Sequence, residues 1–487
     1  MWKAIPLLFP VVAFANGETL YVRPSGDCAN NGNGRAFACA ASAGATGAWN
    51  NFTDLNTSTR LATTDTVGKV DPGDTLCVIG SHMAQLTYGD GGGAGLGSGS
   101  AGLPITIDFD CAEGPGRIDP PSNVNYAFYS EQHHLVINEP KGSGPTNLGN
   151  IFYFPSNAAY LDRQITINGG AIEDCIPKTG ESCLALYGNN ITVDGLQCDP
   201  SNGSSGGYCV LTDGKNITVK NTVTTDALGT CLVMDNTVDD SKFINNTCTQ
   251  VAPEGAGRSC FEINDQDSVT TPAYVIGNTC TFNYTVSDEG SIYAFGVLAK
   301  NAAYILGNRV TGGTAAVSVQ SSGNELIVIA GNKFISQQKQ SIALANSNVQ
   351  VYNNTVVGDG TNSGIYSFVT GTNVIFRNNI LKGNNIGIEE VQAGSTNVDS
   401  HNDFYSNTTN LTINSVSTAL GTGSITTDPT LDANYDIGAA SPAWNTGTPV
   451  YPHRGQNGKC VGSIVNIGAT CANPVPYGYT LKPKRRH

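Results

Sequence analysis

The feature that most constrains the fold of this chain is a short segment that recurs between about Gly169 and Asp403. In each copy, a few β-branched or aromatic residues run into an Asn, as in Phe243-Ile-Asn-Asn246. The column of these positions, with spacings of 22 to 32 residues, is Asn221, Asn246, Asn278, Asn308, Asn332, Asn354, Asn379 and, at its end, Asp403. A repeat of this length predicts a solenoid, in which each turn buries its apolar face against the next turn.

The repeated segments alternate apolar with polar residues and lack helical periodicity, so they predict strands. A second set of short apolar segments precedes the Asn column, and four of its members begin at Cys183, Cys209, Cys231 and Cys260. Two or three short strands per turn, separated by Gly and Asn corners, are typical of an all-β solenoid. We therefore predict a single right-handed parallel β-helix of about ten or more coils. Leucine-rich repeats are excluded because they need several Leu in every turn.

The Asn column has a physical cause. A sharp corner between parallel strands turns backbone N–H and C=O groups away from water. Asn tolerates the left-handed corner conformation, and its amide both donates and accepts hydrogen bonds. At the strand spacing of about 4.8 Å, stacked amides can bond one another along the axis. We therefore expect an internal Asn ladder.

The N-terminus resembles an export signal. A short apolar run ends in Ala13-Phe-Ala15, which predicts a signal peptide over residues 1–15 with cleavage after Ala15. The run is brief and contains Pro6 and Pro10, so we expect no membrane span. The formal net charge of −14 argues against nucleic-acid binding. These features predict a protein that is secreted or held at the cell surface.

The chain contains 14 Cys, and an even number in an exported chain predicts disulfides. Local spacing predicts four pairs: Cys28–Cys39, Cys77–Cys111, Cys175–Cys183 and Cys460–Cys471. The remaining central cysteines stack in neighbouring turns within bridging distance, so their pairing stays open. A shared metal on the adjacent His133 and His134 is not expected, because neighbouring residues of a strand point to opposite faces.

Segments near both ends resemble a known family. Leu20-Tyr-Val-Arg-Pro-Ser-Gly26, Asp71-Pro-Gly-Asp-Thr-Leu-Cys77-Val-Ile-Gly80 and Leu103-Pro-Ile-Thr-Ile107 resemble the first coils of secreted bacterial β-helix proteins of the pectate-lyase-like superfamily. Asp428-Pro-Thr-Leu and Ser441-Pro-Ala-Trp-Asn-Thr-Gly447 are similar to the closing turns of such proteins. No specific subfamily is identified, and the superfamily includes lyases, hydrolases, epimerases and adhesins.

With the repeat, this resemblance predicts the organisation of the chain. Residues 16–165 form an N-terminal cap and the first coils, and residues 166–415 form the central β-helix with its Asn ladder. Residues 416–487 form a capping region and a basic tail. The caps cover the open ends of the solenoid, which would otherwise expose unpaired strand edges.

Charge gathers beside the second set of segments. If Leu184, Val210, Leu232 and Phe261 point inward, alternation sends the intervening residues outward. Asp213, Asp235 and Asn264 then stack on consecutive turns, with Glu262 beside them. The other charged residues that we expect near this face are Asp265, Asp267, Arg258, Lys300 and Arg309.

Stacked carboxylates repel one another unless a cation lies between them, and oxygen-rich ledges suit Ca²⁺. We therefore predict that Asp213, Asp235 and Asn264 bind Ca²⁺. The resemblance implies a lyase, in which the ion neutralises a uronate and a basic residue abstracts a proton. Lys300 and Arg258 are the candidates for that chemistry. Substrate contacts are predicted for Asp265, Asp267 and Arg309.

Two alternatives stay open. Glu262 and Asp235 could act as acid and base in a glycoside hydrolase or epimerase. A non-catalytic surface or adhesion protein is the third interpretation, favoured by an aromatic content of 8%, which leaves few rings for sugar stacking. Among the catalytic interpretations, we favour β-elimination on an acidic extracellular polysaccharide.

Overall fold

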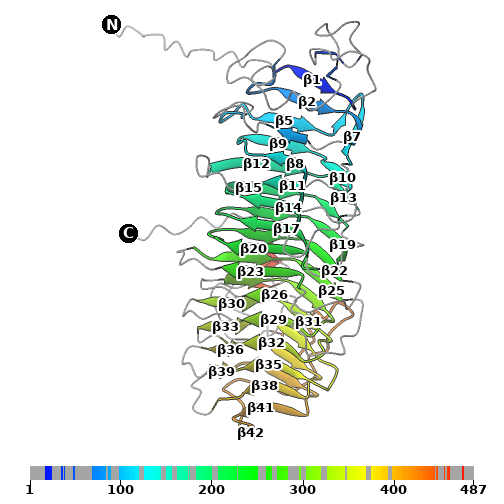
Figure 1. Cartoon of the computed structure of the whole chain (residues 1–487). Coiled ribbons are helices and arrows are strands. Elements are labelled where there is room, and N and C mark those ends of the chain that lie inside the picture. The colour runs from blue at the N-terminus through cyan, green and yellow to red at the C-terminus, as the bar shows by residue number, and fades with distance from the viewer. Residues whose placement is uncertain are drawn as a thin grey trace, which may run out of the picture.

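The computed structural model is a long column of stacked turns, with β1 near one end and β42 near the other (Figure 1). No helix occurs in the part of the chain that the structure describes. That part comprises residues 17–24, 35–36, 38, 48–49, 69–83, 86–88, 98–119, 126–143, 150–155, 162–173, 175, 182–199, 207–227, 229–250, 259–265, 271–282, 295–297, 303–319, 326–345, 348–368, 374–392, 398–444, 446–447, 454–455, 458–460 and 474–475.

Successive strands visit three sheets in turn, and each strand pairs in parallel with the equivalent strand one turn later. The first sheet comprises β1 (Thr19–Val22), β2 (Thr75–Val78), β5 (Ile105–Asp108), β9 (Leu135–Asn138), β12 (Asp162–Asn168), β15 (Asn189–Asp194), β18 (Thr218–Lys220), β21 (Lys242–Ile244), β24 (Ala273–Ile276), β27 (Ala303–Leu306), β30 (Ile327–Ala330), β33 (Val349–Tyr352), β36 (Ile375–Arg377) and β39 (Val398–Ser400).

The second sheet comprises β3 (Gly80–His82), β7 (Gly114–Ile118), β10 (Lys141–Ser143), β13 (Ala171–Glu173), β16 (Gln197–Cys198), β19 (Val223–Ala227), β22 (Thr247–Gln250), β25 (Thr279–Phe282), β28 (Arg309–Thr311), β31 (Lys333–Ile335), β34 (Thr355–Val357), β37 (Ile380–Lys382) and β40 (Asp403–Tyr405), with β6 (Asp110–Cys111) paired to β7.

The third sheet comprises β4 (Leu86–Tyr88), β8 (Tyr126–Ser130), β11 (Asn150–Phe154), β14 (Ser182–Tyr187), β17 (Tyr208–Asp213), β20 (Leu232–Asn236), β23 (Phe261–Asp265), β26 (Phe295–Val297), β29 (Ala315–Val319), β32 (Gln340–Leu344), β35 (Ser363–Ser367), β38 (Ile386–Glu390), β41 (Thr409–Ile413) and β42 (Val416–Ser417). A separate small sheet contains β43 (Arg454–Gly455), β44 (Gly458–Cys460) and β45 (Pro474–Val475).

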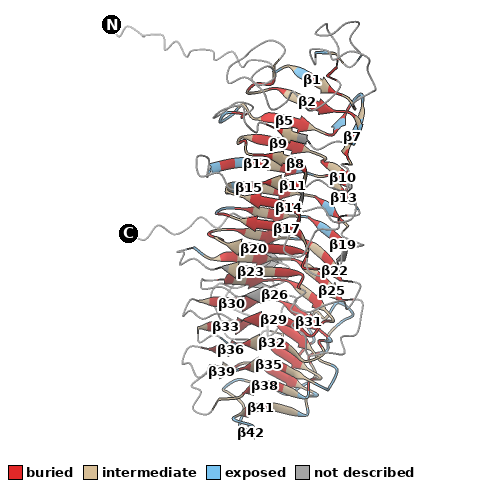
Figure 2. Cartoon of the chain, in the orientation of Figure 1, coloured by how far each residue is buried: buried red, intermediate tan, exposed pale blue. Residues whose placement is uncertain are grey.

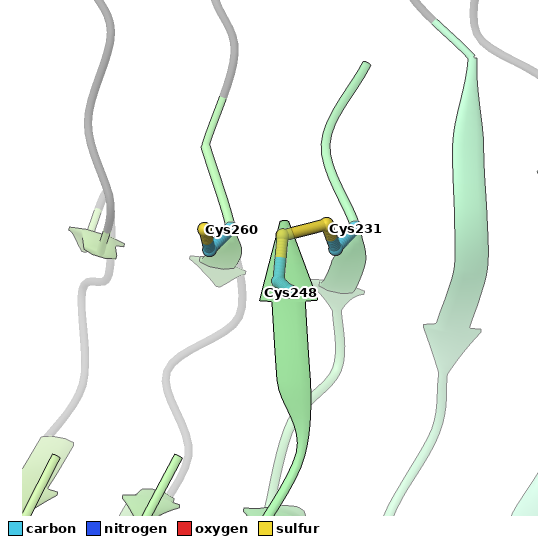
Figure 3. A group of neighbouring side chains, drawn as sticks. All are labelled: Cys231, Cys248 and Cys260. Carbon is cyan, nitrogen blue, oxygen red and sulfur yellow. A yellow bond between two sulfur atoms is a disulfide. The ribbon is translucent and has the colours of Figure 1, made fainter. Parts of the chain in front are cut away.

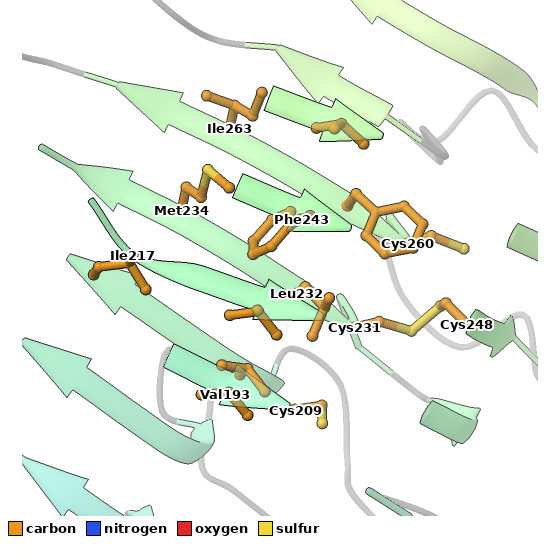
Figure 4. Packing of buried hydrophobic residues seen from close by; sticks show 14 of the residues in the cluster. Val193, Cys209, Ile217, Cys231, Leu232, Met234, Phe243, Cys248, Cys260 and Ile263 are labelled. Carbon is orange, nitrogen blue, oxygen red and sulfur yellow. A yellow bond between two sulfur atoms is a disulfide. The ribbon is translucent and has the colours of Figure 1, made fainter. Parts of the chain in front are cut away.

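This topology is a parallel β-helix, so the predicted all-β solenoid fold class is confirmed. Alternation favours this fold, because it places the inward side chains of strands such as β24 in one continuous core. Buried positions recur on successive strands of the column (Figure 2). In the first sheet, Phe243, Val275, Ile305 and Ile329 follow one another in register and are fully buried. Side chains of different sheets share this core, for example Met234 of the third sheet and Phe243 of the first sheet (Figure 4).

The corner between the first and second sheets contains the Asn ladder. Asn278, Asn308 and Asn332 illustrate its geometry. Asn278 Nδ2 donates to Asn308 Oδ1 at 3.0 Å, and Asn308 Nδ2 donates to Asn332 Oδ1 at 3.0 Å. Each Oδ1 also accepts a backbone N–H from the preceding turn, and each Nδ2 also donates to a strand carbonyl, as Asn308 Nδ2 does to Val275 O. The members, all almost wholly buried, are Asn246, Asn278, Asn308, Asn332, Asn354, Asn379 and Asn402.

Two predicted members of the ladder are wrong by one residue. Asn221 has a φ of 54° and forms the left-handed corner, and the following Thr222 donates its N–H to Asn246 Oδ1. At the far end, Asn402 is the ladder residue and Asp403 already lies in β40. Two consecutive residues form each corner and have different roles. The first residue adopts the positive φ, and the second points its amide inward. Asn suits both positions, so the sequence does not distinguish them.

The described cysteines form five disulfides, which confirm Cys77–Cys111 and Cys175–Cys183. The pairs that the sequence left open are Cys198–Cys209, Cys231–Cys248 and Cys260–Cys280. Cys28, Cys39 and Cys471 lie outside the described residues, so the Cys28–Cys39 and Cys460–Cys471 pairings stay predictions. Disulfides of this number are typical of proteins in oxidising compartments.

The pairing pattern shifts by one turn at Thr224. In the second sheet, Cys198, Thr224, Cys248 and Cys280 follow one another in register. Because Thr224 occupies the cysteine position of its turn, Cys231 pairs with Cys248 from the next second-sheet strand. Cys260 lies beside that bond (Figure 3) and pairs with Cys280.

The C-terminal segment packs against the outer face of the second sheet. The Lys333 side chain is 3% exposed, and its Nζ donates to Asp436 Oδ2 and to Asn434 O, both at 2.8 Å. A small apolar cluster of Ile380, Ile437 and Ala443 joins the same surfaces. The described part of this segment therefore lies along the side of the column, and the predicted capping of the open end stays a prediction.

Replacing one ladder residue should destabilise the protein measurably. Asn332→Ala removes the acceptor of two Asn308 N–H groups and the donor to Ile305 O, all in a dry corner. We expect a loss of about 1–3 kcal/mol in the free energy of unfolding, measured by denaturant titration. Asn434→Ala, at an exposed side chain, is the control and should change it by less than about 0.5 kcal/mol. Equal losses in both variants would contradict the ladder.

A buried carboxyl beneath the C-terminal segment should make stability depend on pH. Asp403 is fully buried, and its two side-chain oxygens accept no hydrogen bond in the structure. Burial raises its pKa from 3.8 to about 7; nearby Asp428 adds to the shift and Lys382 opposes it. Because the folded-state pKa is raised, the stabilisation is present below the unfolded pKa and is lost as pH rises toward 7.

Asp403→Asn should therefore raise the melting temperature at pH 8. It should also reduce the decrease in melting temperature between pH 4 and pH 8, the range that spans the unfolded and folded pKa values of Asp403. The exposed Asp359→Asn is the control and should retain the wild-type slope. Thermal melts across that pH range measure both variants. A wild-type slope in Asp403→Asn would show that this carboxyl does not titrate on folding.

Candidate active site

The third sheet places the predicted acids on its outer face. Leu184, Val210, Leu232 and Phe261 are buried inside the column, as the alternation predicts. The intervening residues therefore face outward. Thr212 pairs with Met234, which sets Asp213 beside Asp235, and Asp235 pairs with Asn264. We call Asp213, Asp235 and Asn264 the acidic row.

A second outward row runs parallel to it, two residues earlier in each strand. This row, which we call the Glu262 row, is formed in register by Tyr129, Tyr153, Ala185, Leu211, Val233, Glu262, Gly296, Ser318, Ala343, Tyr366 and Glu389. Glu262 is half-buried in the middle of this row. It thus lies diagonally next to Asp235, and their charges interact.

Amide groups surround the acidic row. Asn236 Nδ2 donates to Asp213 Oδ2 at 3.2 Å and to Asp235 Oδ2 at 3.3 Å. The Thr237 backbone N–H donates to Asp213 Oδ1 at 3.3 Å, and Asn264 Nδ2 donates to Asp235 Oδ1 at 2.9 Å. Every oxygen of the two carboxyl groups therefore accepts an N–H hydrogen bond.

This arrangement does not fit the predicted Ca²⁺ site. A calcium ion needs six to eight oxygen ligands, and here amide N–H groups, one of them from the backbone, point at the four carboxyl oxygens. Among the described residues, no carboxylate set of three brings its oxygens within 4.8 Å of one another. No metal ion is therefore assigned to the acidic row in the reaction proposed below.

Burial tunes the two acids at the centre of the face. Burial raises the pKa of Glu262, and the charge of Asp235 adds to the shift, while a hydrogen bond from Ser259 Oγ at 3.3 Å opposes it. Burial also raises the pKa of Asp235, with a smaller contribution from Asp213. The pKa of Tyr208 is raised by its own burial and by the charges of both acids. Two adjacent carboxyl groups thus hold protons more tightly than exposed acids do.

The other predicted site residues do not all join this face. Arg309 lies on β28 of the second sheet, where its guanidinium donates to Asn434 O and covers the Tyr435 ring at 5.6 Å. It therefore binds the C-terminal segment. Asp265 ends β23, where its backbone pairs with Asn236. Arg258, Asp267 and Lys300 lie outside the described residues, so their roles stay predictions.

Sequence reasoning missed the tyrosines of this face. Tyr126, Tyr129, Tyr153 and Tyr187 lie on three consecutive strands, and Tyr187 pairs in register with Asp213. The chain is poor in aromatic residues overall, and that average concealed a local concentration. Alternation around the inward Phe152 and Phe154 could have placed Tyr153 on the outward face of the third sheet.

A separate open groove of about 550 Å³ lies over the first sheet, lined by residues that include Ser100, His134, Thr166 and Asn190. At its edge, His133 Nδ1 and His134 Nδ1 are 2.6 Å apart. The prediction that these two rings point to opposite faces is wrong. His134 adopts a φ of 53°, so the two residues form a corner before β9 and alternation does not apply.

Comparison with known proteins gives limited information. The family model "Periplasmic copper-binding protein (NosD)" matches residues 257–435. No curated protein matches the chain. Within the described residues, no helix could cross a membrane.

Two solved structures are similar at low identity. "Crystal structure of pectate lyase Pel9A" matches with 14% identity and a TM-score of 0.43, over 94% of this chain and 98% of that chain. A mannuronic acid specific polysaccharide family 6 lyase from human gut microbiota matches with 15% identity and a TM-score of 0.36, over 69% of this chain and 70% of that chain. Likenesses this distant say nothing about the activity of this chain.

Because the acidic row fits calcium poorly, we expect Ca²⁺ not to stabilise the protein in solution. Millimolar Ca²⁺ should leave the melting temperature of the protein unchanged relative to Mg²⁺ at the same ionic strength, because metal binding would have to displace four N–H donors. Differential scanning calorimetry measures this. A calcium-specific rise that disappears in Asp235→Asn would restore the acidic row as a calcium site.

Proposed function

We propose that this chain is a secreted protein that binds an extracellular polysaccharide along the third sheet and hydrolyses it. The observation that supports the proposal is the pair Glu262 and Asp235. They lie on adjacent strands of one outer face, and burial raises the pKa of Glu262, the candidate proton donor. A raised pKa keeps a carboxyl protonated closer to neutral pH, which general-acid catalysis requires.

In this proposal Glu262 donates a proton to the oxygen of the glycosidic bond as the bond breaks. Asp235 supplies the second carboxylate, which activates water or attacks the sugar carbon, and its negative charge stabilises the positive sugar ring in the transition state. Asn236 holds Asp213 and Asp235 together through one amide group. Ser259 Oγ, donating to Glu262 Oε2, fixes the orientation of the proton donor.

The charge of this face favours an uncharged polysaccharide. Asp213, Asp235 and Glu262 lie on β17, β20 and β23, and neither these strands nor β14 contains a Lys or Arg. A uronate would meet three acids without a strand-borne cation to neutralise it. Elimination, which the sequence favoured, needs a uronate and a base. Its candidate bases, Lys300 and Arg258, lie outside the described residues, so elimination stays the alternative to hydrolysis.

The name of the matching family mentions copper, but the residues of the matched segment do not fit that metal. Residues 257–435 contain one His, His401, and no Met. Their two cysteines, Cys260 and Cys280, are bonded to each other. Copper sites in proteins use His, Met and free Cys ligands, so this segment offers a poor set. We therefore do not extend copper binding to this chain.

The proposed location outside the cytoplasm rests on two features. The described disulfides need an oxidising compartment. The first 15 residues, which lie outside the described part of the chain, resemble a cleaved export signal. An extracellular polysaccharide is the substrate class that such a protein meets.

The test compares two products on the same substrates. Purified protein is incubated with neutral and acidic polysaccharides, and both reducing ends and the ultraviolet absorbance of unsaturated uronates are recorded. We expect reducing ends without that absorbance. Glu262→Gln should lower the rate about 100-fold or more, because the proton donor is lost.

Glu389→Gln is a matched control for this test. Glu389 lies in the same outward row and, like Glu262, accepts a hydrogen bond from a serine hydroxyl, that of Ser363. This variant should retain the wild-type rate. Unsaturated product would show elimination instead of hydrolysis. No product on any polysaccharide would favour the non-catalytic surface protein.

A further inference from the structure

Four tyrosines form a continuous aromatic surface at one end of the Glu262 row. Tyr126 and Tyr129 stack with centroids 4.8 Å apart, and Tyr126 and Tyr153 stack at 5.7 Å. Tyr129 and Tyr153 are 5.8 Å apart, and Tyr153 meets Tyr187 edge-on at 5.9 Å. All four side chains are partly exposed. We call this group the tyrosine platform.

The platform is aligned with the candidate active site by strand register. Tyr129 and Tyr153 belong to the Glu262 row itself. Tyr153 lies four strand spacings, or about 19 Å, from Glu262. Tyr187 pairs with Asp213, so the platform borders the acidic row directly. Ala185, Leu211 and Val233 occupy the row between Tyr153 and Glu262, and all three are buried, at 0%, 7% and 3% exposed.

We propose that the tyrosine platform is a binding subsite that stacks the sugar rings of an uncharged oligosaccharide beside the acidic row. The link to the acids rests on the proposed function, whereas the binding itself does not. Stacking suits Tyr because its ring presents a flat apolar face and its hydroxyl stays in water. A sugar ring presents the complementary pattern, an apolar C–H face with hydroxyl groups at its edge.

Charge on the platform favours an uncharged ligand. Glu131 accepts the hydrogen bond of the Tyr129 hydroxyl, and Asp213 lies next to Tyr187. Arg163, ten residues after Tyr153, is fully buried, and its guanidinium donates to Ser130 O, Glu131 O and Pro155 O. A polyuronate would therefore meet like charges at both ends of the platform.

A second tyrosine stack on another sheet provides a matched control. Tyr274 and Tyr304 of the first sheet stack at 5.5 Å with nearly parallel rings. Tyr304 packs against an apolar cluster that contains Leu306 and Val328, and Lys242 Nζ lies 5.7 Å from the centroid of the Tyr274 ring. The role of this pair is therefore structural, and Tyr274→Ala removes a stacked ring from the protein without touching the platform.

The experiment measures binding in the Glu262→Gln background, so that cleavage does not consume the ligand. Isothermal titration calorimetry with cellohexaose, xylohexaose, mannohexaose and hexagalacturonate compares the parent with three added changes: Tyr153→Ala, Tyr153→Phe and Tyr274→Ala. We expect at least one neutral hexasaccharide to bind and the acid one to bind more weakly. Tyr153→Ala should weaken binding about two- to tenfold, and Tyr153→Phe and Tyr274→Ala should retain it.

Each contrary result has a distinct meaning. The platform is overturned if no neutral hexasaccharide binds, or if Tyr153→Ala binds as well as the parent. It is also overturned if Tyr274→Ala weakens binding as much as Tyr153→Ala, because the effect is then structural. Binding that depends on Tyr153, in a protein whose wild type cleaves no polysaccharide, supports the platform and removes only the proposed hydrolysis.

Discussion

The hydrogen-bonded column of buried Asn side chains is the interaction on which the rest of the structure depends. Each amide satisfies a backbone N–H and a strand carbonyl that the corner turns away from water, and it bonds the amide of the next turn. An unpaired polar group in this dry corner would cost more than the net gain of one hydrogen bond. The ladder therefore fixes each turn against its neighbour, from Asn246 to Asn402.

Because the register is fixed, equivalent side chains of successive turns form continuous rows on the outer face of a sheet. Because every turn repeats the same path, an outward side chain of the third sheet lies directly above the equivalent side chain of the next turn. Each turn thus contributes one residue to the Glu262 row, for example Tyr153, Ala185, Leu211, Val233 and Glu262. A polysaccharide is also a linear repeat, which makes the outer face of a solenoid a suitable binding surface.

The sequence predicted the parallel β-helix and the inward and outward faces of the third sheet because alternation is a local signal. It failed at contacts between distant residues. Arg309 binds Asn434, 125 residues away, and no local pattern indicates that contact. The shift in disulfide pairing depends on Thr224, one residue in a column that only the three-dimensional register reveals. The choice between Asn402 and Asp403 failed because adjacent corner positions favour the same polar residues.

The central claim is that a sugar chain binds on the outer face of the third sheet, and a crystal structure of Glu262→Gln with a bound neutral oligosaccharide tests it most directly. The account predicts sugar rings on Tyr129 and Tyr153 and a glycosidic oxygen next to residue 262. A sugar chain bound instead in the first-sheet groove beside His134 and Asn190 would contradict it.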